Sequence, residues 1–338
     1  MAAGAGLKED IQESERLQHV MGADLERVSQ RVFEVTELSY PVASSIIHEI
    51  VLAGGKRLRP LLVLLAGRAY DYSERFDELI TAAAGVELLH IASLVHDDTI
   101  DRAALRRGKP TLNSVMSTGA TILVGDFLFA QSAMLAARTG DVRVVSVFAS
   151  TLGQLCDGQL LELFDAHKTD QQIETYIRRI YGKTASLFAG AAEMGAVLGR
   201  APESDIQQLR QFASEIGLAF QIQDDIFDLT RDSEGLGKPA GNDLRQGTVT
   251  LPTLLFAQRT ASGSADARLL DHVVSGDDVA DDVVDELIDR IRSSGAIDDA
   301  RAEAQQYQTL ARERLAVVPH ADTRDLLGSW ADQALASA

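Results

Sequence analysis

Cysteine and proline are scarce in this chain of 338 residues, which has one cysteine and seven prolines. A single cysteine, Cys156, excludes a disulfide within the chain and suits a reducing compartment, so we expect a cytoplasmic protein. We expect its thiol to be buried as a small apolar side chain. The shortage of proline, together with many alanines and leucines, favours helix over strand.

Long apolar runs and a net positive charge are also missing. No stretch approaches the ~20 apolar residues of a membrane helix, and the first residues lack the basic and apolar segments of a signal peptide. The formal net charge is −18, which disfavours nucleic acid binding because phosphate backbones are anionic. An anionic substrate must therefore bind at locally concentrated basic residues or through metal ions.

Apolar residues recur every three or four positions along most of the chain, which predicts an all-α protein. Residues 1–20 are polar, and we expect a flexible N-terminal segment there, followed by a single helical domain over 21–338. The acidic run at 277–286 is typical of a solvated helix N-terminus. The clearest helices are predicted at about 76–101, 112–138, 141–166, 171–199, 203–230 and 250–260.

Two aspartate motifs end apolar helices. Their members are Asp97, Asp98 and Asp101 in HDDTID, and Asp224, Asp225 and Asp228 in QDDIFD. Like charges four residues apart destabilise a bare helix, and one such motif is weak evidence because acidic helix ends are common. Two copies in equivalent positions predict metal sites, since carboxylate and phosphate oxygens are the ligands that Mg²⁺ prefers.

Basic residues gather beside these motifs in spite of the acidic composition. They are Lys56 and Arg59 in GGKRLRP, Arg106 and Arg107 in RRGKPT, Lys183 in GKTASL and Lys238 in GLGKPAG. Glycines let the backbone approach an anion, and guanidinium groups fit phosphate oxygens. A solvated surface explains any one of them, whereas the set predicts a diphosphate site.

In this order the segments resemble those of the trans-isoprenyl diphosphate synthases, or polyprenyl synthetases, from about Leu38 to Pro252. The resemblance implies the isoprenoid synthase fold, a bundle of roughly ten or more helices around a central cavity, as a homodimer. It implies a prenyltransferase that joins isopentenyl diphosphate head to tail to an allylic diphosphate (farnesyl or geranylgeranyl) and releases pyrophosphate. The implied cofactor is Mg²⁺, with Mn²⁺ as a substitute.

The resemblance also implies roles for individual residues. Asp97, Asp101 and Asp224 resemble the principal Mg²⁺ ligands, with Asp98, Asp225 and Asp228 supporting them; these aspartates and Lys183 form the implied catalytic set. Isopentenyl diphosphate is assigned to Lys56, Arg59, His90 and Arg107. The allylic diphosphate is assigned to Arg106, Lys183, Thr184, Gln221 and Lys238. Thr248 stands where relatives often carry Lys, and Arg245 is the candidate that compensates.

The residues before the first aspartate motif bear on product length. Short-chain members of the family often place bulky aromatics four or five residues before the first aspartate, where this chain has Ser93 and Ala92, with Leu89 a turn earlier. We therefore expect an open path for the growing tail and products of roughly C30–C50. Close packing of two helices would explain the small residues equally well.

Other interpretations stay open. A shorter-chain geranylgeranyl diphosphate synthase shares every motif, whereas a class I terpene cyclase usually has an Asn/Ser/Glu-type second metal motif in place of DDIFD. A non-catalytic partner subunit would normally lack one aspartate motif, and a purely structural helical protein would not need the ordered set. Use of the product in a quinone side chain, and transient membrane contact during product release, are expectations from family analogy alone.

Overall fold

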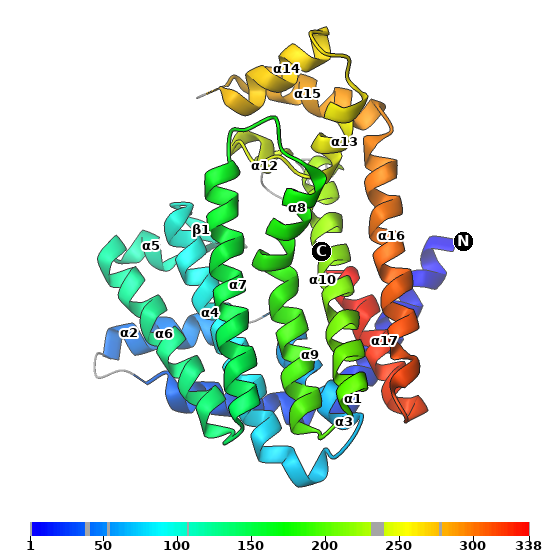
Figure 1. Cartoon of the computed structure of the whole chain (residues 1–338). Helices are drawn as coiled ribbons and strands as arrows, with labels where there is room; N and C mark the ends of the chain where they lie inside the picture. The colour runs from blue at the N-terminus through cyan, green and yellow to red at the C-terminus, as the bar shows by residue number, and fades with distance from the viewer. Residues whose placement is uncertain are drawn as a thin grey trace. The chain divides into compact units, whose positions relative to one another are not determined.

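The computed structural model describes residues 2–37, 41–52, 55–106, 108–230, 240–276 and 279–337. Almost all of these residues are helical (Figure 1), which confirms the all-α prediction. The chain forms two compact units, the first from residues 1–152, 187–210 and 315–333, the second from 153–186, 211–314 and 334–338. Two of the unit boundaries fall within helices α7 (Val142–Asp165) and α10 (Glu203–Thr230). A single domain over 21–338 stays a prediction.

Helix α4 (Phe76–Ile100) is the centre of the first unit and packs against α1, α3 and α6. A Cβ on Gly85 of α4 would lie 3.3 Å from the Ser132 carbonyl oxygen of α6, so these two helices pack closely. The other elements of this unit are α1 (Ala2–Val35), α2 (Pro41–Leu52), α3 (Leu58–Arg68), the 3-10 turns η1 (Ser73–Arg75) and η3 (Leu315–Val317), α5 (Leu112–Val115), α6 (Thr118–Arg138), and most of α9 (Ser186–Leu198) and α17 (Ala321–Leu335).

The second unit packs helices α13 to α16 around an apolar core that includes Ile222, Ile226 and Leu251. Helices α14 and α15 lie side by side (Figure 1). Asp281 and Asp282 form the exposed first turn of α15, as the acidic run predicts. The elements of this unit are α8 (Ile173–Ile180), the π-helical turn η2 (Tyr181–Ala185), α12 (Asn242–Arg245), α13 (Leu251–Arg259), α14 (Ala265–Ser275), α15 (Asp281–Ser293) and α16 (Ala296–Arg314).

The sole cysteine differs from the prediction, whereas a flexible segment over residues 1–20 stays a prediction. Helix α1 begins at Ala2, and Leu17 is buried. Leu17 is one of a series of apolar residues that α1 turns toward the core, which the polar composition of residues 1–20 conceals. Cys156 is exposed on α7, not buried, because that side of the helix is not covered within the structure.

Two predicted helices are interrupted. The predicted helix over 112–138 is split before Thr118, where the Ser117 hydroxyl accepts a hydrogen bond from the Ala120 N–H and caps α6. The predicted helix over 171–199 contains the π-helical turn at Tyr181–Ala185. After α4, β1 (Leu105–Arg106) and β2 (Lys109–Pro110) form a minimal antiparallel pair.

Two helical stretches are long and apolar enough to cross a membrane by length and composition, Ser73–Ile100 and Thr118–Arg138. The apolar window of the first is 78% buried, as for the core helix of a globular unit, whereas that of the second is 39% buried. The expected absence of a membrane-spanning segment stays a prediction.

Candidate active site

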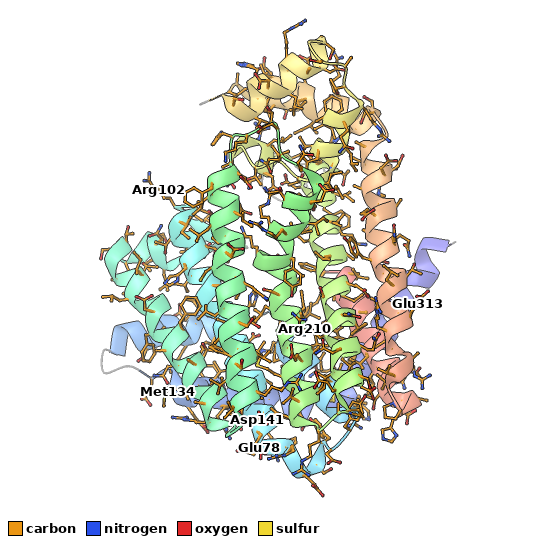
Figure 2. All side chains as sticks on the ribbon, in the orientation of Figure 1. Glu78, Arg102, Met134, Asp141, Arg210 and Glu313 are labelled. Carbon is orange, nitrogen blue, oxygen red and sulfur yellow. The ribbon has the colours of Figure 1, made fainter. Side chains whose placement is uncertain are left out.

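One face of α4 carries the first aspartate motif. His90, Ser93, Asp97 and Asp101 follow each other at intervals of three or four residues, so they lie along the same side of the helix. Asp97 is partly exposed. Asp101, the C-cap residue directly after α4, is exposed. Arg102 then adopts a left-handed conformation (φ 50°) and points away from the protein (Figure 2), which ends the helix directly after the motif.

Asp98 lies on a different side of α4 and is buried. The Arg106 Nε–H donates to both of its carboxylate oxygens, at 2.9 and 3.0 Å. The Ala103 N–H donates to the Asp98 carbonyl at 2.9 Å. In this structure, the Nε–H of the partly exposed Arg106 thus joins Asp98 to the turn after α4. Arg107, its predicted neighbour in substrate binding, lies outside the described residues.

Arg59 and His90, both assigned to isopentenyl diphosphate from the sequence, lie together in the first unit. Arg59 Nη1 is 3.2 Å from His90 Nε2, and its guanidinium carbon is 4.4 Å from the centre of the Phe188 ring. Helix α3 is buried and apolar from Pro60 to Gly67, so Arg59 is an unusual, partly exposed charge at its first turn. Lys56 is exposed in the loop before α3.

Glu87 is a buried carboxylate that the motifs do not reveal. It lies one turn before His90 on α4 and is 7% exposed. Burial raises its pKa, and the positive charges of Arg57 and Arg59 oppose that shift. Three charged residues from α4 and the start of α3 are therefore electrostatically coupled beside His90.

The second aspartate motif lies on α10, where Asp225 belongs to a buried hydrogen-bond chain. The Tyr176 hydroxyl donates to Asp225 Oδ2 at 2.7 Å, and the Gln221 amide donates to Oδ1 at 2.9 Å. The Thr184 hydroxyl in turn donates to the Gln221 side-chain oxygen at 2.7 Å. Thr184 and Gln221, both assigned to the allylic diphosphate, are thus brought together with the aspartate motif. Asp224, by contrast, is exposed.

Asp228 connects the motif to the segment that follows it. Backbone N–H groups of Asn242 and Asp243, at the start of α12, donate to its two carboxylate oxygens, each at 3.1 Å. Asp228 therefore caps α12 across 14 residues of chain. Asp243 was missed by the sequence prediction. Burial, and then the charges of Asp228, Asp225 and Asp224, raise its pKa well above the usual range.

Lys183 lies in the π-helical turn η2, a type of irregularity often found at functional sites. Its ammonium group forms an ion pair with Glu162 of α7, a second acidic residue that the sequence prediction missed. No local pattern marks Glu162, because its partner is 21 residues away in the chain. Lys238 lies outside the described residues.

The π-helical turn and α7 meet backbone to backbone at two glycines. A Cβ on Gly158 would lie 2.3 Å from the Lys183 backbone nitrogen, and one on Gly182 would lie 2.8 Å from the Gln154 carbonyl oxygen. Backbone atoms cannot move aside as a side chain does, so both positions require glycine. This close approach places Lys183 next to Glu162.

Gly158→Ala is therefore expected to lower the free energy of unfolding by at least about 2 kcal/mol, because the added methyl group overlaps the η2 backbone. Urea unfolding followed by circular dichroism would measure the loss. Gly153→Ala is the matched control on the same helix, since its Cβ would have no neighbour within 4 Å. That change should stabilise the protein, by up to about 1 kcal/mol. Equal stability of the two variants would contradict the close contact.

The buried Asp225 carboxyl predicts a pH dependence of stability. Burial raises its pKa to about 7, although the hydrogen bonds from Tyr176 and Gln221 lower it. In the unfolded chain an aspartate ionises near pH ~4. Because the folded state holds the proton more tightly, the metal-free protein should lose stability as the pH rises from about 4 to about 7.

Asp225→Asn should reduce the loss of stability with rising pH, that is, the slope of the free energy of unfolding against pH, since the amide does not titrate. Urea midpoints of the metal-free protein at a series of pH values would measure it, with exposed Asp282→Asn as the control that keeps the wild-type slope. The pH dependence of stability that remains in this variant is expected to come from Asp243, whose pKa is also raised. An unchanged slope in Asp225→Asn would rule out the assignment to this carboxyl.

Arg245 does not replace the lysine that is missing at Thr248. Its guanidinium forms ion pairs with Asp281 and, at 2.8 Å, with Asp285 of α15. Thr248 is fixed through its backbone, whose N–H donates to the Asp243 carbonyl at 2.8 Å. The idea that Arg245 compensates at a phosphate is thus not supported, because its charge is neutralised by the acidic helix.

The hydrogen bonds of three motif aspartates and the exposure of the other three bear on metal binding. Asp98, Asp225 and Asp228 have their carboxylates bound by Arg106, by Tyr176 and Gln221, and by the α12 backbone. Asp97, Asp101 and Asp224 are partly or fully exposed, and their hard oxygen atoms suit a divalent cation. Across the part of the chain that the structure describes, no three acidic, histidine or cysteine side chains are already close enough to hold a metal ion.

The sequence is similar to a known protein family and to characterised relatives. The family model described as "Polyprenyl synthetase" matches residues 41–291. "Heptaprenyl diphosphate synthase component 2" of Geobacillus stearothermophilus is 38% identical over 90% of this chain and 92% of its own length. "Short chain isoprenyl diphosphate synthase" of Methanothermobacter thermautotrophicus is 35% identical over 91% of this chain and 93% of its own length.

Solved structures show the same similarity in three dimensions. A decaprenyl diphosphate synthase from Rhodobacter capsulatus superposes with a TM-score of 0.90 at 32% identity, covering 96% of this chain and 99% of its own. A polyprenyl synthase from Caulobacter crescentus, complexed with calcium and isoprenyl diphosphate, superposes with a TM-score of 0.88 at 33% identity, covering 95% and 97%.

Proposed function

Because this chain belongs to the polyprenyl synthetase family, we propose that it extends an allylic diphosphate with isopentenyl diphosphate to a long all-trans polyprenyl diphosphate, roughly C30–C50. The observation that carries the proposal is the face of α4. His90, in contact with Arg59, precedes Asp97 by seven residues, or about 10 Å along the helix. Arg59 of α3 thus supplies a cationic anchor next to the α4 face that carries the carboxylates of Asp97 and Asp101, which suits two diphosphates held side by side.

The proposed metal ligands are Asp97, Asp101 and Asp224, with Mg²⁺ as the ion and Mn²⁺ as a substitute. Bound there, Mg²⁺ supplies charge stabilisation for the diphosphate leaving group. The complex of the Caulobacter relative with calcium and isoprenyl diphosphate supports a divalent cation next to a diphosphate. The supporting aspartates act through structure: Asp98 orders the turn after α4, and Asp228 orders α12.

The chain's own residues bind and orient the substrates. Arg59, His90 and Lys56 hold isopentenyl diphosphate, while Lys183, Thr184 and Gln221 hold the allylic diphosphate. The allylic C–O bond breaks, and the isopentenyl double bond forms the new C–C bond. The proton lost from the adjacent carbon goes to the departing pyrophosphate. Preorganised donors stabilise the charge that develops on the leaving group, and apolar helices exclude water from the cation.

The deciding experiment incubates the purified protein alone with radiolabelled isopentenyl diphosphate, farnesyl diphosphate and Mg²⁺. Long polyprenyl diphosphates, separated by reversed-phase chromatography, are the expected products. Products ending at geranylgeranyl diphosphate would identify the shorter-chain alternative, and cyclic hydrocarbons would identify a terpene cyclase. No turnover without a second subunit would identify a partner subunit.

We further propose a homodimer in the cytoplasm, assembled through α6 and the start of α7. Leu123 on α6 is 69% exposed and Val142 at the start of α7 is 84% exposed, and Met134 is also exposed on α6 (Figure 2). Exposed large apolar residues on consecutive helices of this kind are typical of interaction surfaces. Light scattering of Leu123→Lys should give a monomer where the wild type gives a dimer, whereas flotation of the wild type with vesicles would favour a membrane surface instead.

A further inference from the structure

The Arg59 side chain rests on an aromatic pair that reaches the C-terminal helix. Phe188 of α9 lies beneath the guanidinium, 4.4 Å from ring centre to guanidinium carbon. Trp330 of α17 meets Phe188 edge to face, with ring centres 5.7 Å apart and planes at 72°. Both rings are fully buried, so their positions are fixed by the packing around them.

Trp330 also holds the backbone next to Arg59. Its indole N–H donates to the carbonyl of Leu58 at 2.8 Å. The same side chain thus touches the residue before Arg59 in the chain and the ring beneath its guanidinium. His90 contacts the guanidinium from α4 at 3.2 Å. These contacts involve α3, α4, α9 and α17, and all of them lie within the first unit.

Such support matters for an arginine that binds a diphosphate. A guanidinium recognises phosphate oxygens through a fork of N–H groups whose direction must match the ligand. An unsupported arginine samples many rotamers and loses that freedom on binding, whereas a stacked one has already lost most of it. Glu87, coupled in charge to Arg57 and Arg59, also acts on Arg59, but a single carboxylate does not define the plane of its guanidinium.

We propose that Trp330 is a positioning residue for the isopentenyl diphosphate site, acting through Phe188 and Leu58 on Arg59. The C-terminal helix α17 is then part of the substrate-binding apparatus, although no sequence motif lies in it. This inference rests on the proposed function, and in particular on Arg59 as a ligand of isopentenyl diphosphate.

The test compares Michaelis constants for the two substrates in Trp330→Phe and Trp330→Leu. Trp330→Phe keeps a ring against Phe188 and loses only the N–H donor, so it guards against a variant that fails to fold. We expect the Michaelis constant for isopentenyl diphosphate to rise about threefold in Trp330→Phe and about tenfold in Trp330→Leu, with that for farnesyl diphosphate unchanged within twofold. Isothermal titration of isopentenyl diphosphate into the metal-free protein should show the same loss of affinity.

Leu79→Ala is the matched control, because Leu79 is a fully buried residue of α4 about three turns before His90. It should destabilise the unit while leaving both Michaelis constants unchanged. The inference would be overturned if the Trp330 variants changed the Michaelis constants of both substrates equally, or left that of isopentenyl diphosphate unchanged. The proposed function would still stand in that case, provided that the wild type is active. An inactive wild type would overturn the proposed function itself.

Discussion

Replacing Asp97 or Asp224 by alanine is expected to lower turnover by at least about two orders of magnitude. Each change removes a carboxylate oxygen from a proposed Mg²⁺ ligand set, and with it the stabilisation of charge on the leaving diphosphate. Asp97 is partly exposed and Asp224 is exposed, so neither change leaves a cavity. Each also lies beside another aspartate, and the loss of like-charge repulsion favours the folded state.

Initial rates at saturating Mg²⁺ and both substrates would measure the effect. Helical circular dichroism and the thermal midpoint should stay close to those of the wild type, which separates a catalytic loss from unfolding. Asp282→Ala on α15 is the matched control, because it removes an exposed carboxylate from the first turn of another helix. More than a tenth of the wild-type rate in either motif variant would count against the metal assignment.

Ser93→Phe is expected to shorten the product to farnesyl or geranylgeranyl diphosphate. Ser93 lies between His90 and Asp97 on the same face of α4 and is partly exposed, so a ring at this position extends into the space beside the proposed substrate groups. On the proposed function, the tail of the product would start at these groups and grow along the helix. A phenylalanine one turn before the aspartate would stop it early.

Ala92→Phe should behave differently from Ser93→Phe. Ala92 and Leu89 are both completely buried, so a ring at 92 is forced into the packing around α4 and costs about 1–3 kcal/mol of stability. Chromatography of labelled products, together with urea unfolding, distinguishes the two variants. An unchanged product distribution in a stable Ser93→Phe protein, or a wild type that stops at C20, would reject an open tail path.

The helices that carry the aspartate motifs were predictable because both are long and strongly periodic. The predicted span of 76–101 differs from α4 by one residue at its end, and the predicted 203–230 coincides with α10. The apolar period fixes such helices, and the tertiary environment only reinforces them. The same period also places His90 and Asp97 on one face, the feature on which the proposed function depends most.

Contacts between distant segments were not predictable in the same way. The π-helical turn at Lys183 has the composition of an ordinary helix, and Gly158, which the turn approaches closely, lies 25 residues earlier. Only the folded structure shows that Glu162 pairs with Lys183 and that Asp243 lies among the charges of the second aspartate motif. Arg245 looked available for a phosphate because the sequence does not show that α15 neutralises it.

Trp330 is the only tryptophan of the chain. Its indole stands one aromatic ring away from Arg59, on the buried side of the cation. Indole emission responds to nearby charge, and a diphosphate that neutralises or moves the guanidinium alters the electric field across Phe188 and Trp330. The protein therefore carries its own optical probe at one substrate site, with no competing indole elsewhere and no label to attach. Occupancy of that site becomes readable in real time, even before any carbon–carbon bond forms.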